Sequence, residues 1–483
     1  MRQAFPVENI VLDRRREQQL RKQLYKELRR LIESRLLPSG SALPSTRVLA
    51  SDLRVGRNTV IAAYDQLALE GYISTSLGMR PTVSGLPSVD VSPHERARLG
   101  ISELSVRGQF MSRLPFHHGR PGVMAFHPGL PDADNFPFNT WSKLITRRTK
   151  LARTELFGSY FITGYPPLCE AIARYLGASR GVICSPEQIV ITNGAQSAFD
   201  ILARCLTDPG DTVWMEEPGY YGASAALASS GARLMPLHVD DDGWSLEPPA
   251  TSPRAIFVTP SCHHPLGLTM SMEQRLNLIR LAREWNAWII EDDYDSEYRF
   301  QGQPIPALQG LAPDSRVIFV GTFAKILFPA MRLGYMVVPA ALRDSFVAAL
   351  SSTGQFGPLI TQAALADFIN EGHLTRHLRR MRRIYAERRS YFIGLFERQL
   401  GAWMELRHMD SGIQLVGRFR TQVDDRAIAN AAQIQGINVS PLSLQYRNPT
   451  RQSGLLMGFA ASDQKTTRRA MQRLALIVEN ALG

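Results

Sequence analysis

The sequence contains few cysteines and no long apolar segment. Its four cysteines, Cys169, Cys184, Cys205 and Cys262, are spread over 483 residues without a Cys-x-x-Cys pair. This argues against a disulfide framework and a cysteine-based metal site. No apolar run approaches the ~18 residues of a membrane span, and the first residues lack the apolar core of a secretory signal. We therefore expect a cytoplasmic protein without a membrane segment.

Positive charge is concentrated in the N-terminal part of the chain. The formal net charge is +11, and residues 1–85 contain 14 Lys and Arg against 8 Asp and Glu. More than half of the excess charge therefore lies in less than a fifth of the chain. This asymmetry favours a phosphate-rich partner for the N-terminal segment, although a solvated basic surface would give the same count.

The composition changes along the chain and predicts three regions. Residues 1–85 predict helices followed by a short β-ribbon. Residues 86–120 contain Pro and Gly without sustained periodicity and predict a linker. Residues 121–483 alternate short apolar runs with amphipathic stretches of helix length. This pattern predicts an α/β domain with a largely parallel sheet, followed by a smaller C-terminal α+β lobe that begins with a helix over Leu374–Arg398.

Five strands are expected in the third region, and each ends where a loop begins. They are Gln188–Thr192, Asp211–Glu216, Ala255–Thr259, Ala287–Glu291 and Arg316–Val320. Ligands of open α/β sheets bind beyond the carboxyl ends of the strands, so these ends are where we look for chemistry.

Residues 45–83 predict two helices joined by a turn and followed by a β-wing. The first helix begins after the N-cap Ser45 and ends at Leu53. Arg54-Val55-Gly56 is expected to form a tight turn, in which the glycine would tolerate a left-handed backbone. The second helix runs from Arg57 to about Glu70. The wing pairs residues 71–75 with 81–83, and its tip is Gly78-Met79-Arg80.

Polar and basic residues of this segment are positioned to contact DNA. Arg57, Asn58 and Thr59 lie in the first turn of the second helix, where a recognition helix meets base edges and phosphates. Arg80 at the wing tip could reach a phosphate or the minor groove. For Arg47 and Arg57, simple solvation at a helix surface is the alternative.

This segment resembles the GntR-type winged helix-turn-helix. The matching residues are Leu43-Pro44-Ser45-Thr46-Arg47, Leu49-Ala50, Arg57-Asn58-Thr59-Val60, Ala63-Tyr64, Leu67 and Glu70-Gly71-Tyr72. Two positions differ from the family pattern: Gly56 replaces a serine, and Arg80 replaces the second glycine of Gly-x-Gly. The resemblance implies that the segment binds double-stranded DNA.

The end of the fifth strand carries a candidate Schiff-base lysine. Gly321-Thr322-Phe323-Ala324-Lys325 follows that strand. A partly desolvated lysine on a loop can be neutral and attack an aldehyde. Thr322 and Arg332 could clamp a phosphate, Arg332 through its bidentate fork. Taken alone, Lys325 is more simply a surface lysine.

The end of the fourth strand carries a candidate partner for a ring nitrogen. A carboxylate such as Asp292 at the end of a buried strand is costly unless it meets a cation, and a protonated pyridine nitrogen is one. Tyr294 would donate to the phenolic oxygen of the ring. The alternatives are that Asp292 caps a helix or forms an ordinary ion pair, or that Asp293 takes the role at the ring nitrogen.

Residues after the first two strands complete the set. Backbone N–H groups of Ala195 and Gln196, at the start of a helix, would hold a phosphate. Tyr220 could stack on the pyridine face or belong to the core. Each signal is weak alone, but their order on successive strand ends indicates a site for pyridoxal 5'-phosphate (PLP).

With these residues in place, the chain resembles the MocR/GabR group, in which a GntR-type head is fused to a fold type I aminotransferase domain. Further matches are Arg180-Gly181-Val182, Gln188-Ile189, Asp208-Pro209-Gly210-Asp211 and Leu333-Gly334-Tyr335. The resemblance implies a Schiff base at Lys325, Asp292 at the pyridine nitrogen, Tyr294 at the phenolic oxygen and Tyr220 on the ring. It implies phosphate contacts from Ala195, Gln196, Thr322 and Arg332, and a head-to-tail homodimer that binds two promoter half-sites.

Some residues depart from the aminotransferase pattern. His264 occupies the position of an asparagine near the ring oxygen. It and His263 have no matched partners for a metal site, so we predict no metal. A leucine replaces the C-terminal arginine that binds the substrate carboxylate, and Arg447 or Arg451 could substitute for it.

The favoured function is a PLP-dependent transcription regulator that senses an amine, an amino acid or PLP itself at Lys325. The alternative is an active aminotransferase with an appended DNA-binding head, which would need the same Lys325, Asp292 and Tyr294. The missing carboxylate-binding arginine argues mildly against turnover. A cofactor-free scaffold is disfavoured because the residue set is complete.

Overall fold

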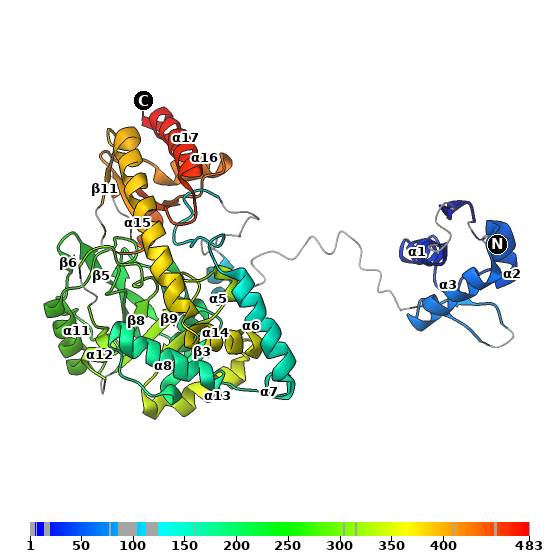
Figure 1. Ribbon diagram of the computed structural model, residues 1–483, viewed down its shortest axis with the longest axis horizontal. Helices are drawn as coiled ribbons and strands as arrows, with labels where there is room; N and C mark the ends of the chain where they lie inside the picture. Colours follow the sequence, from blue (N-terminus) through cyan, green and yellow to red (C-terminus); the bar gives the residue numbers. More distant parts are fainter. Residues whose placement is uncertain are drawn as a thin grey trace. The chain divides into compact units, whose positions relative to one another are not determined.

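A computed structural model of the chain describes residues 5, 7–13, 20–76, 79–85, 104–112, 124–158, 160–302, 305–313, 316–407, 409, 411–448 and 452–482, with Arg153 described by its backbone alone. The chain divides into two compact units, Met1–Glu103 and Leu104–Gly483 (Figure 1). Each unit is described by itself. None of the helices in these residues is both long and apolar enough to cross a membrane.

The first unit consists of helices and a two-stranded wing. Its elements are the 3-10 helix η1 (Val7–Asn9), α1 (Leu20–Glu33), α2 (Thr46–Leu53), α3 (Arg57–Leu69), β1 (Ile73–Ser74) and β2 (Thr82–Val83). The strands are antiparallel, with Ile73 opposite Val83. The helices bury a common apolar core that includes Leu24, Leu28, Leu31, Leu49, Val60 and Leu67. The predicted helix pair and wing are confirmed.

The turn between α2 and α3 differs from the prediction. Arg54 has the left-handed conformation, with φ of +49°, and its backbone N–H donates to the carbonyls of Ala50 and Ser51. Gly56 has φ of −64° and is the N-cap of α3, where it makes no side-chain capping bond. The turn is present, but its left-handed residue is Arg54, which closes α2, and the tolerance of Gly56 for that conformation is not used.

The second unit contains a large mixed sheet. Its strands are β3 (Ile189–Thr192), β4 (Thr212–Glu217), β5 (Arg233–Asp240), β6 (Gly243–Trp244), β7 (Ala255–Val258), β8 (Trp288–Asp293), β9 (Val317–Thr322) and β10 (Gly334–Val337). They lie in the order β3-β10-β9-β8-β7-β4-β5-β6. The run β9-β8-β7-β4-β5 is parallel, whereas β10 is antiparallel to both of its neighbours.

The five predicted strands are confirmed as β3, β4, β7, β8 and β9, with ends that differ by at most two residues. Strands β5, β6 and β10 were not predicted from the sequence. Strand β10 lies between β3 and β9 in the sheet, so β3 and β9 are not neighbours. The order of the strands along the sequence does not reveal this.

The helices of the second unit lie around its sheets. They are α5 (Val106–Ser112), α6 (Phe138–Leu151), α7 (Arg153–Phe157), α8 (Pro166–Arg180), α9 (Ala195–Leu206), α10 (Tyr221–Ser229), α11 (Met272–Glu284), α12 (Leu308–Leu311), α13 (Arg343–Thr353), α14 (Leu359–Asn370), α15 (His373–Leu400), α16 (Asp425–Ile434) and α17 (Gln464–Leu482). Along β3, Ile189 and Ile191 belong to one buried cluster and Val190 to another. This alternation means that both faces of the strand are packed.

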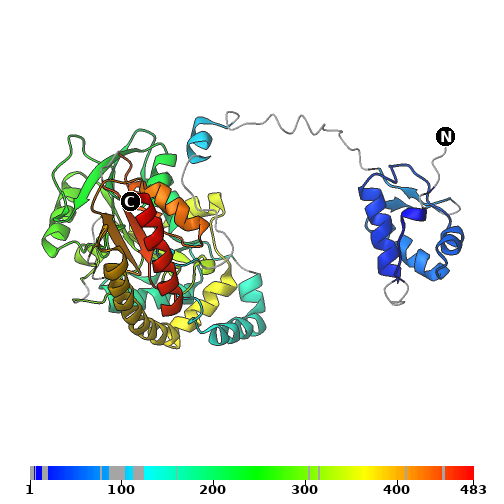
Figure 2. The same ribbon diagram turned by 90° about the horizontal axis from the view of Figure 1, so that it is seen from above.

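A smaller lobe follows the long helix α15, which confirms the predicted helix over Leu374–Arg398. Strands β11 (Met404–Leu406), β12 (Gln414–Phe419), β13 (Ser440–Pro441) and β14 (Gly454–Gly458) form an antiparallel sheet in the order β11-β12-β14-β13. Helix α17 packs along α15 (Figures 1 and 2). The predicted α+β lobe is confirmed.

The N-cap of α2 gives a test of the first unit. The Ser45 hydroxyl accepts from the Val48 N–H at 3.3 Å. Ser45→Ala removes this bond and should destabilise α2 by about 1 kcal/mol. Amide exchange over Thr46–Leu53, measured by mass spectrometry on the full chain, should accelerate about 5-fold. Ser51→Ala, at an exposed position within the same helix, is the control; equal exchange in both variants would contradict the cap assignment.

Candidate functional site

Strand ends β8 and β9 bring the candidate residues together at one edge of the large sheet. Asp292 pairs with Val320 in the parallel register of β8 and β9. Thr322 ends β9, and Lys325 follows three residues later. Because both strands are parallel and adjacent, their carboxyl ends lie on the same side.

Lys325 points towards a segment that precedes α6. Its Nζ donates to the carbonyl of Gly129 at 2.9 Å. A Cβ at Gly129 would lie 2.5 Å from that nitrogen, and φ at this glycine is +63°. Burial lowers the pKa of Lys325, while the carboxylates of Asp295 and Asp292 oppose the shift. The amine is therefore shifted towards its neutral, nucleophilic form.

Asp292 and Asp293 have different partners. Asp293 forms an ion pair with Arg180, with Oδ2 at 2.6 Å from Nε. Asp292 is 4% exposed, and among the described residues its Oδ1 has no hydrogen-bond partner. Burial raises the pKa of Asp292 well above its usual value. Oδ1 of Asp293 also lacks a hydrogen-bond partner among these residues, but Arg180 neutralises Asp293, whereas no such ion pair is found for Asp292. A buried carboxylate without a protein cation fits an external cation, which favours Asp292 over Asp293 for the role at a ring nitrogen.

Three aromatic side chains lie around this edge. His264 contacts Tyr220 and Tyr294 edge to face, with ring centroids 5.4 and 6.0 Å apart. Its Nε2 lies 3.1 Å from Oε1 of Gln445, and its Nδ1 lies 3.4 Å from Nε2 of Gln414. Gln414 is on β12 and Gln445 on the 3-10 helix η7 (Leu442–Gln445), so His264 joins the sheet domain to the smaller lobe.

The residues predicted to hold a phosphate lie at two strand ends. Ala195 and Gln196 begin α9 after Gly194, which has φ of +88°, and N–H groups in a first helical turn have no partner within the helix. The Gln196 side chain donates to the Gly222 carbonyl at 2.8 Å, so only its backbone remains for a phosphate. Thr322 is buried, and its Oγ1 accepts from the Ala324 N–H.

Arg332 lies on the other side of β9, at the end of the 3-10 helix η5 (Pro329–Met331), with φ of +51°. Its side chain is exposed. Burial raises the pKa of Tyr220, and the positive charge of Arg332 opposes this shift.

Asp295 and Cys262 belong to this cluster, although the sequence analysis did not select them. Asp295 is 1% exposed, accepts from the Ile413 N–H at 3.3 Å, and has its pKa raised by burial to about 7. The Tyr294 hydroxyl donates to Cys262 Sγ at 3.6 Å. The sequence could have indicated Asp295, because it follows Asp292, Asp293 and Tyr294 directly at the end of the same strand.

Arg447, one of the two candidate substitutes for the carboxylate-binding arginine, has partners within the protein. Its Nη2 lies 2.7 Å from Oε2 of Glu217, and its guanidinium donates to the carbonyls of Met215 and Glu216 at 3.0 Å each. The guanidinium is thus occupied at the end of β4. Arg451, the other candidate, lies outside the described residues.

In the first unit, the predicted DNA-contacting residues are accessible. Arg47, Arg57, Asn58 and Arg80 are exposed and Thr59 is half-buried. Arg57 Nε donates to the Thr46 hydroxyl at 3.4 Å, which links the starts of α2 and α3. Gly78, at the predicted wing tip, lies outside the described residues.

Comparison with known proteins identifies both parts of the chain. Residues 127–474 match the family model of aminotransferase class I and II, and residues 20–81 match that of bacterial regulatory proteins of the gntR family. The chain is 49% identical to the probable rhizopine catabolism regulatory protein MocR of Rhizobium meliloti, over 96% of this chain and 95% of that one. It belongs to the MocR-type regulators of the GntR family.

Two further similarities agree with this membership. The regulator is 30% identical to the HTH-type pyridoxine biosynthesis transcriptional regulator PdxR of Corynebacterium glutamicum, over 94% of this chain and 94% of the other. Its second unit has the fold of LysN, an alpha-aminoadipate aminotransferase from Thermus thermophilus, with a TM-score of 0.72 and 23% identity over 80% of this chain and 99% of that one. The predicted fold, a winged helix-turn-helix joined to an aminotransferase-like domain, is confirmed.

His264 gives a test of the site based on pH. Burial lowers its pKa to about 4. Between that value and the ordinary ~6.5 the unfolded chain binds a proton that the folded chain does not, so the free energy of unfolding falls as the pH falls. Replacing His264 with Asn should reduce the loss between pH 7 and 5 by on the order of 1–2 kcal/mol.

Urea unfolding at the two pH values measures this difference. His238→Asn, at an exposed histidine on β5, is the matched control and should retain the wild-type pH dependence. If His264→Asn also retained it, the imidazole would not be held neutral by its surroundings.

Proposed function

We propose that this MocR-type regulator binds promoter DNA through its first unit and holds PLP at Lys325, where a small amine, an amino acid or PLP itself acts as the effector. The observation that carries the proposal is the unpartnered Oδ1 of buried Asp292 beside the Lys325 amine, in a chain that also has an accessible recognition helix. The proposed boundaries are 1–85 for the DNA-binding domain, 86–120 for the linker and 121–483 for the PLP domain.

The residues around Lys325 fit PLP. When bound, PLP supplies an aldehyde that reacts reversibly with primary amines and a ring that withdraws electrons. Asp292 would hold the protonated ring nitrogen and Tyr294 the phenolic oxygen, with Tyr220 against the ring face. The N–H groups of Ala195 and Gln196, the Thr322 hydroxyl and Arg332 would hold the phosphate. His264 stays neutral at pH 7 because burial lowers its pKa, so it adds no charge at the ring.

The chain's own residues support sensing rather than sustained turnover. Arg447 is held by Glu217 and by two backbone carbonyls, so it does not present a free fork to a substrate carboxylate. An effector shifts a regulator only by its differential affinity for two states. His264 connects the sheet domain with the smaller lobe that such a shift would move. Sustained formation of an oxo acid from an amino acid would favour the aminotransferase alternative.

We further propose that the protein acts as a head-to-tail homodimer on paired half-sites, in the cytoplasm, where bacterial DNA lies. Large apolar side chains around α6 and α7 support a second copy as the partner of this face. Leu151 is 78% exposed, Phe157 63% and Tyr160 83%, and large apolar side chains exposed close together in the sequence are what an interface would cover. A monomeric mass in sedimentation at micromolar concentration would contradict the dimer.

Lys325→Ala tests the PLP site. Without the amine, the visible absorbance band that the wild-type protein gains on addition of PLP should be lost, because no covalent link can form. Lys143→Ala, at an exposed lysine on α6, should gain the band like the wild type. Retention of the band in Lys325→Ala would refute the assignment of this lysine.

Arg57→Ala tests the recognition helix. The affinity for the promoter fragment upstream of the protein's own gene should fall about 10-fold or more, because one cationic contact with the DNA is lost. Fluorescence anisotropy at two salt concentrations measures the affinity and its salt dependence. Lys465→Ala, at an exposed lysine on α17, controls for net charge; an equal loss in both variants would show that Arg57 makes no specific contact.

A further inference from the structure

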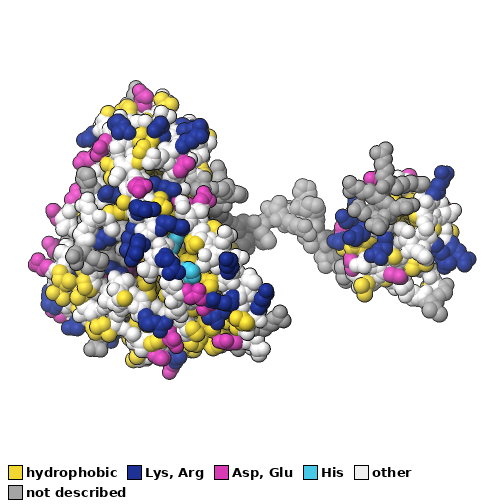
Figure 3. All heavy atoms as spheres, viewed as in Figure 1, with side chains coloured by type: hydrophobic (Ala, Val, Ile, Leu, Met, Phe, Trp, Pro, Cys, Tyr) yellow, Lys and Arg dark blue, Asp and Glu magenta, His cyan; other side chains and the backbone are white. Residues whose placement is uncertain are grey.

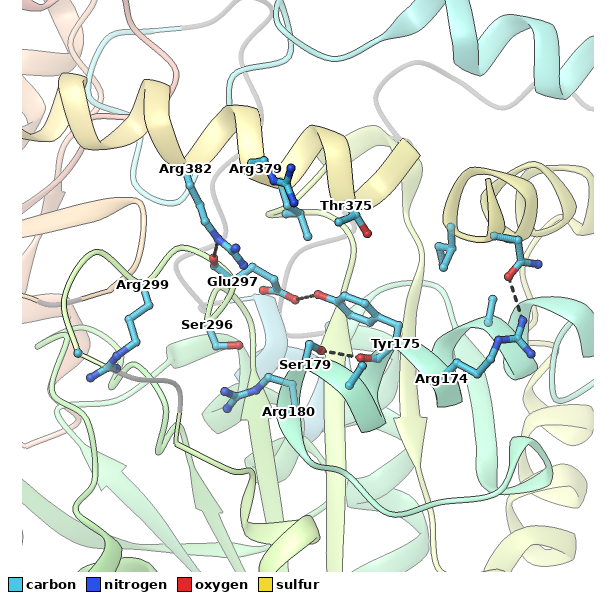
Figure 4. Close-up of a pocket in the computed structure, with 16 residues that line it drawn as sticks. Arg174, Tyr175, Ser179, Arg180, Ser296, Glu297, Arg299, Thr375, Arg379 and Arg382 are labelled. Atoms are coloured by element: carbon cyan, nitrogen blue, oxygen red, sulfur yellow. Dashed lines mark hydrogen bonds between the residues drawn. The ribbon is translucent and has the colours of Figure 1, made fainter. Parts of the chain in front are cut away.

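A second cavity of the aminotransferase-like domain contains none of the residues proposed to bind PLP. Its volume is about 610 Å³, within the usual range for small-molecule sites. Helix α8, the start of α15 and the loop after β8 surround it (Figure 4). We call it the arginine cavity, because Arg174, Arg180, Arg299, Arg379 and Arg382 line it.

The positive charge of the arginine cavity is only partly neutralised. Arg180 is paired with Asp293. Arg174 lies 3.9 Å from a carboxylate oxygen of Glu170 and donates to Asn370 at 2.9 Å. In the described part of the chain, Arg299, Arg379 and Arg382 form no ion pair with a carboxylate. On the face of this domain seen in Figure 3, Lys and Arg side chains gather along α15.

Among the described residues, Glu297 is the one carboxylate that lines the cavity, and it already has a hydrogen-bond partner. The Tyr175 hydroxyl donates to Oε1 of Glu297 at 2.7 Å, and burial raises the pKa of Glu297. Arg382 Nε donates to the backbone carbonyl of Glu297 at 2.6 Å rather than to its carboxylate. Glu297 therefore does little to neutralise the free guanidinium groups.

Donors at the floor of the cavity lack acceptors. Among the described residues, the buried Ser296 Oγ and Arg299 Nε have no hydrogen-bond partner. The other end of the Arg299 guanidinium is fixed, because Nη1 donates to the Thr269 hydroxyl at 3.1 Å. Buried donors without partners are costly and indicate an acceptor that enters from outside.

We propose that the arginine cavity binds a small phosphorylated metabolite, separate from any PLP at Lys325. A phosphate group accepts several charge-assisted hydrogen bonds, and guanidinium forks match its oxygens. The two arginines of α15, Arg379 and Arg382, face the opening, while Arg299 and Ser296 lie below (Figure 4). The backbone of duplex DNA is too wide to enter the cavity. One of its phosphates could contact Arg379 and Arg382 but would not reach Ser296 Oγ and Arg299 Nε.

Titration calorimetry with inorganic pyrophosphate tests the proposal on the full-length protein saturated with PLP. The wild type should bind saturably, and Arg379→Gln and Arg382→Gln should each weaken binding about 10-fold, the usual scale for one charge-assisted contact. Arg383→Gln is the matched control, because Arg383 is an exposed neighbour on α15 that does not line the cavity. It should bind pyrophosphate like the wild type.

Three outcomes would overturn the proposal: no saturable binding, equal weakening by Arg383→Gln, or loss of promoter binding without loss of pyrophosphate binding in Arg379→Gln and Arg382→Gln. The last would assign the arginines to nucleic acid. The thermal unfolding and the PLP absorbance of each variant should be unchanged. Any loss of pyrophosphate binding then does not come from unfolding or from damage to the PLP site. Repeating the titration on protein without added PLP separates the proposal from the proposed function, because the cavity does not depend on Lys325.

Discussion

The burial of Asp292 at the end of β8 is the constraint on which the rest of the site depends. Taking a carboxylate out of water costs several kcal/mol unless a cation or donors replace the water. At the same strand end Asp293 is paired with Arg180, whereas Oδ1 of Asp292 has no partner among the described residues. Arg180 therefore neutralises Asp293, whereas among the described residues Asp292 has no ion pair, so a cationic group beside Lys325 would lower the cost of burying Asp292.

The parallel sheet makes this arrangement possible, and the smaller lobe completes it. Strands β8 and β9 deliver a carboxylate and an amine to one edge because their carboxyl ends coincide. His264 then reaches from the sheet domain to Gln414 and Gln445 of the lobe. A movement of the lobe relative to the sheet domain would break these contacts, so under the proposed function they are where a ligand at Lys325 could affect the position of the lobe.

Much of this was predictable from the sequence, because it depends on local signals. The apolar runs before Thr192, Asp292 and Thr322 predicted strands, and the ends of the parallel strands predicted where the candidate site would lie.

The features that the sequence did not predict depend on contacts between residues that are distant in the chain. The Gly129 carbonyl meets Lys325 from 196 residues away, and Arg447 meets Glu217 across the lobe interface. Strand β10 was missed because its short apolar run does not reveal that it inserts between β3 and β9. The left-handed conformation of Arg54 was not predicted, because the hydrogen bonds that close α2 fix it, although arginine seldom adopts this conformation.

The contacts of Arg447 bear on the proposed distinction between a sensor and an enzyme. Releasing its guanidinium for a ligand carboxylate would leave the buried Glu217 carboxylate without its cation, which is unfavourable. An aminotransferase would have to meet that cost for each substrate in turn, which weakens the orientation that turnover needs. A sensor needs only one binding event with unequal affinity for two states, and the Lys325 amine with its neighbouring carboxylates can provide that without a carboxylate clamp.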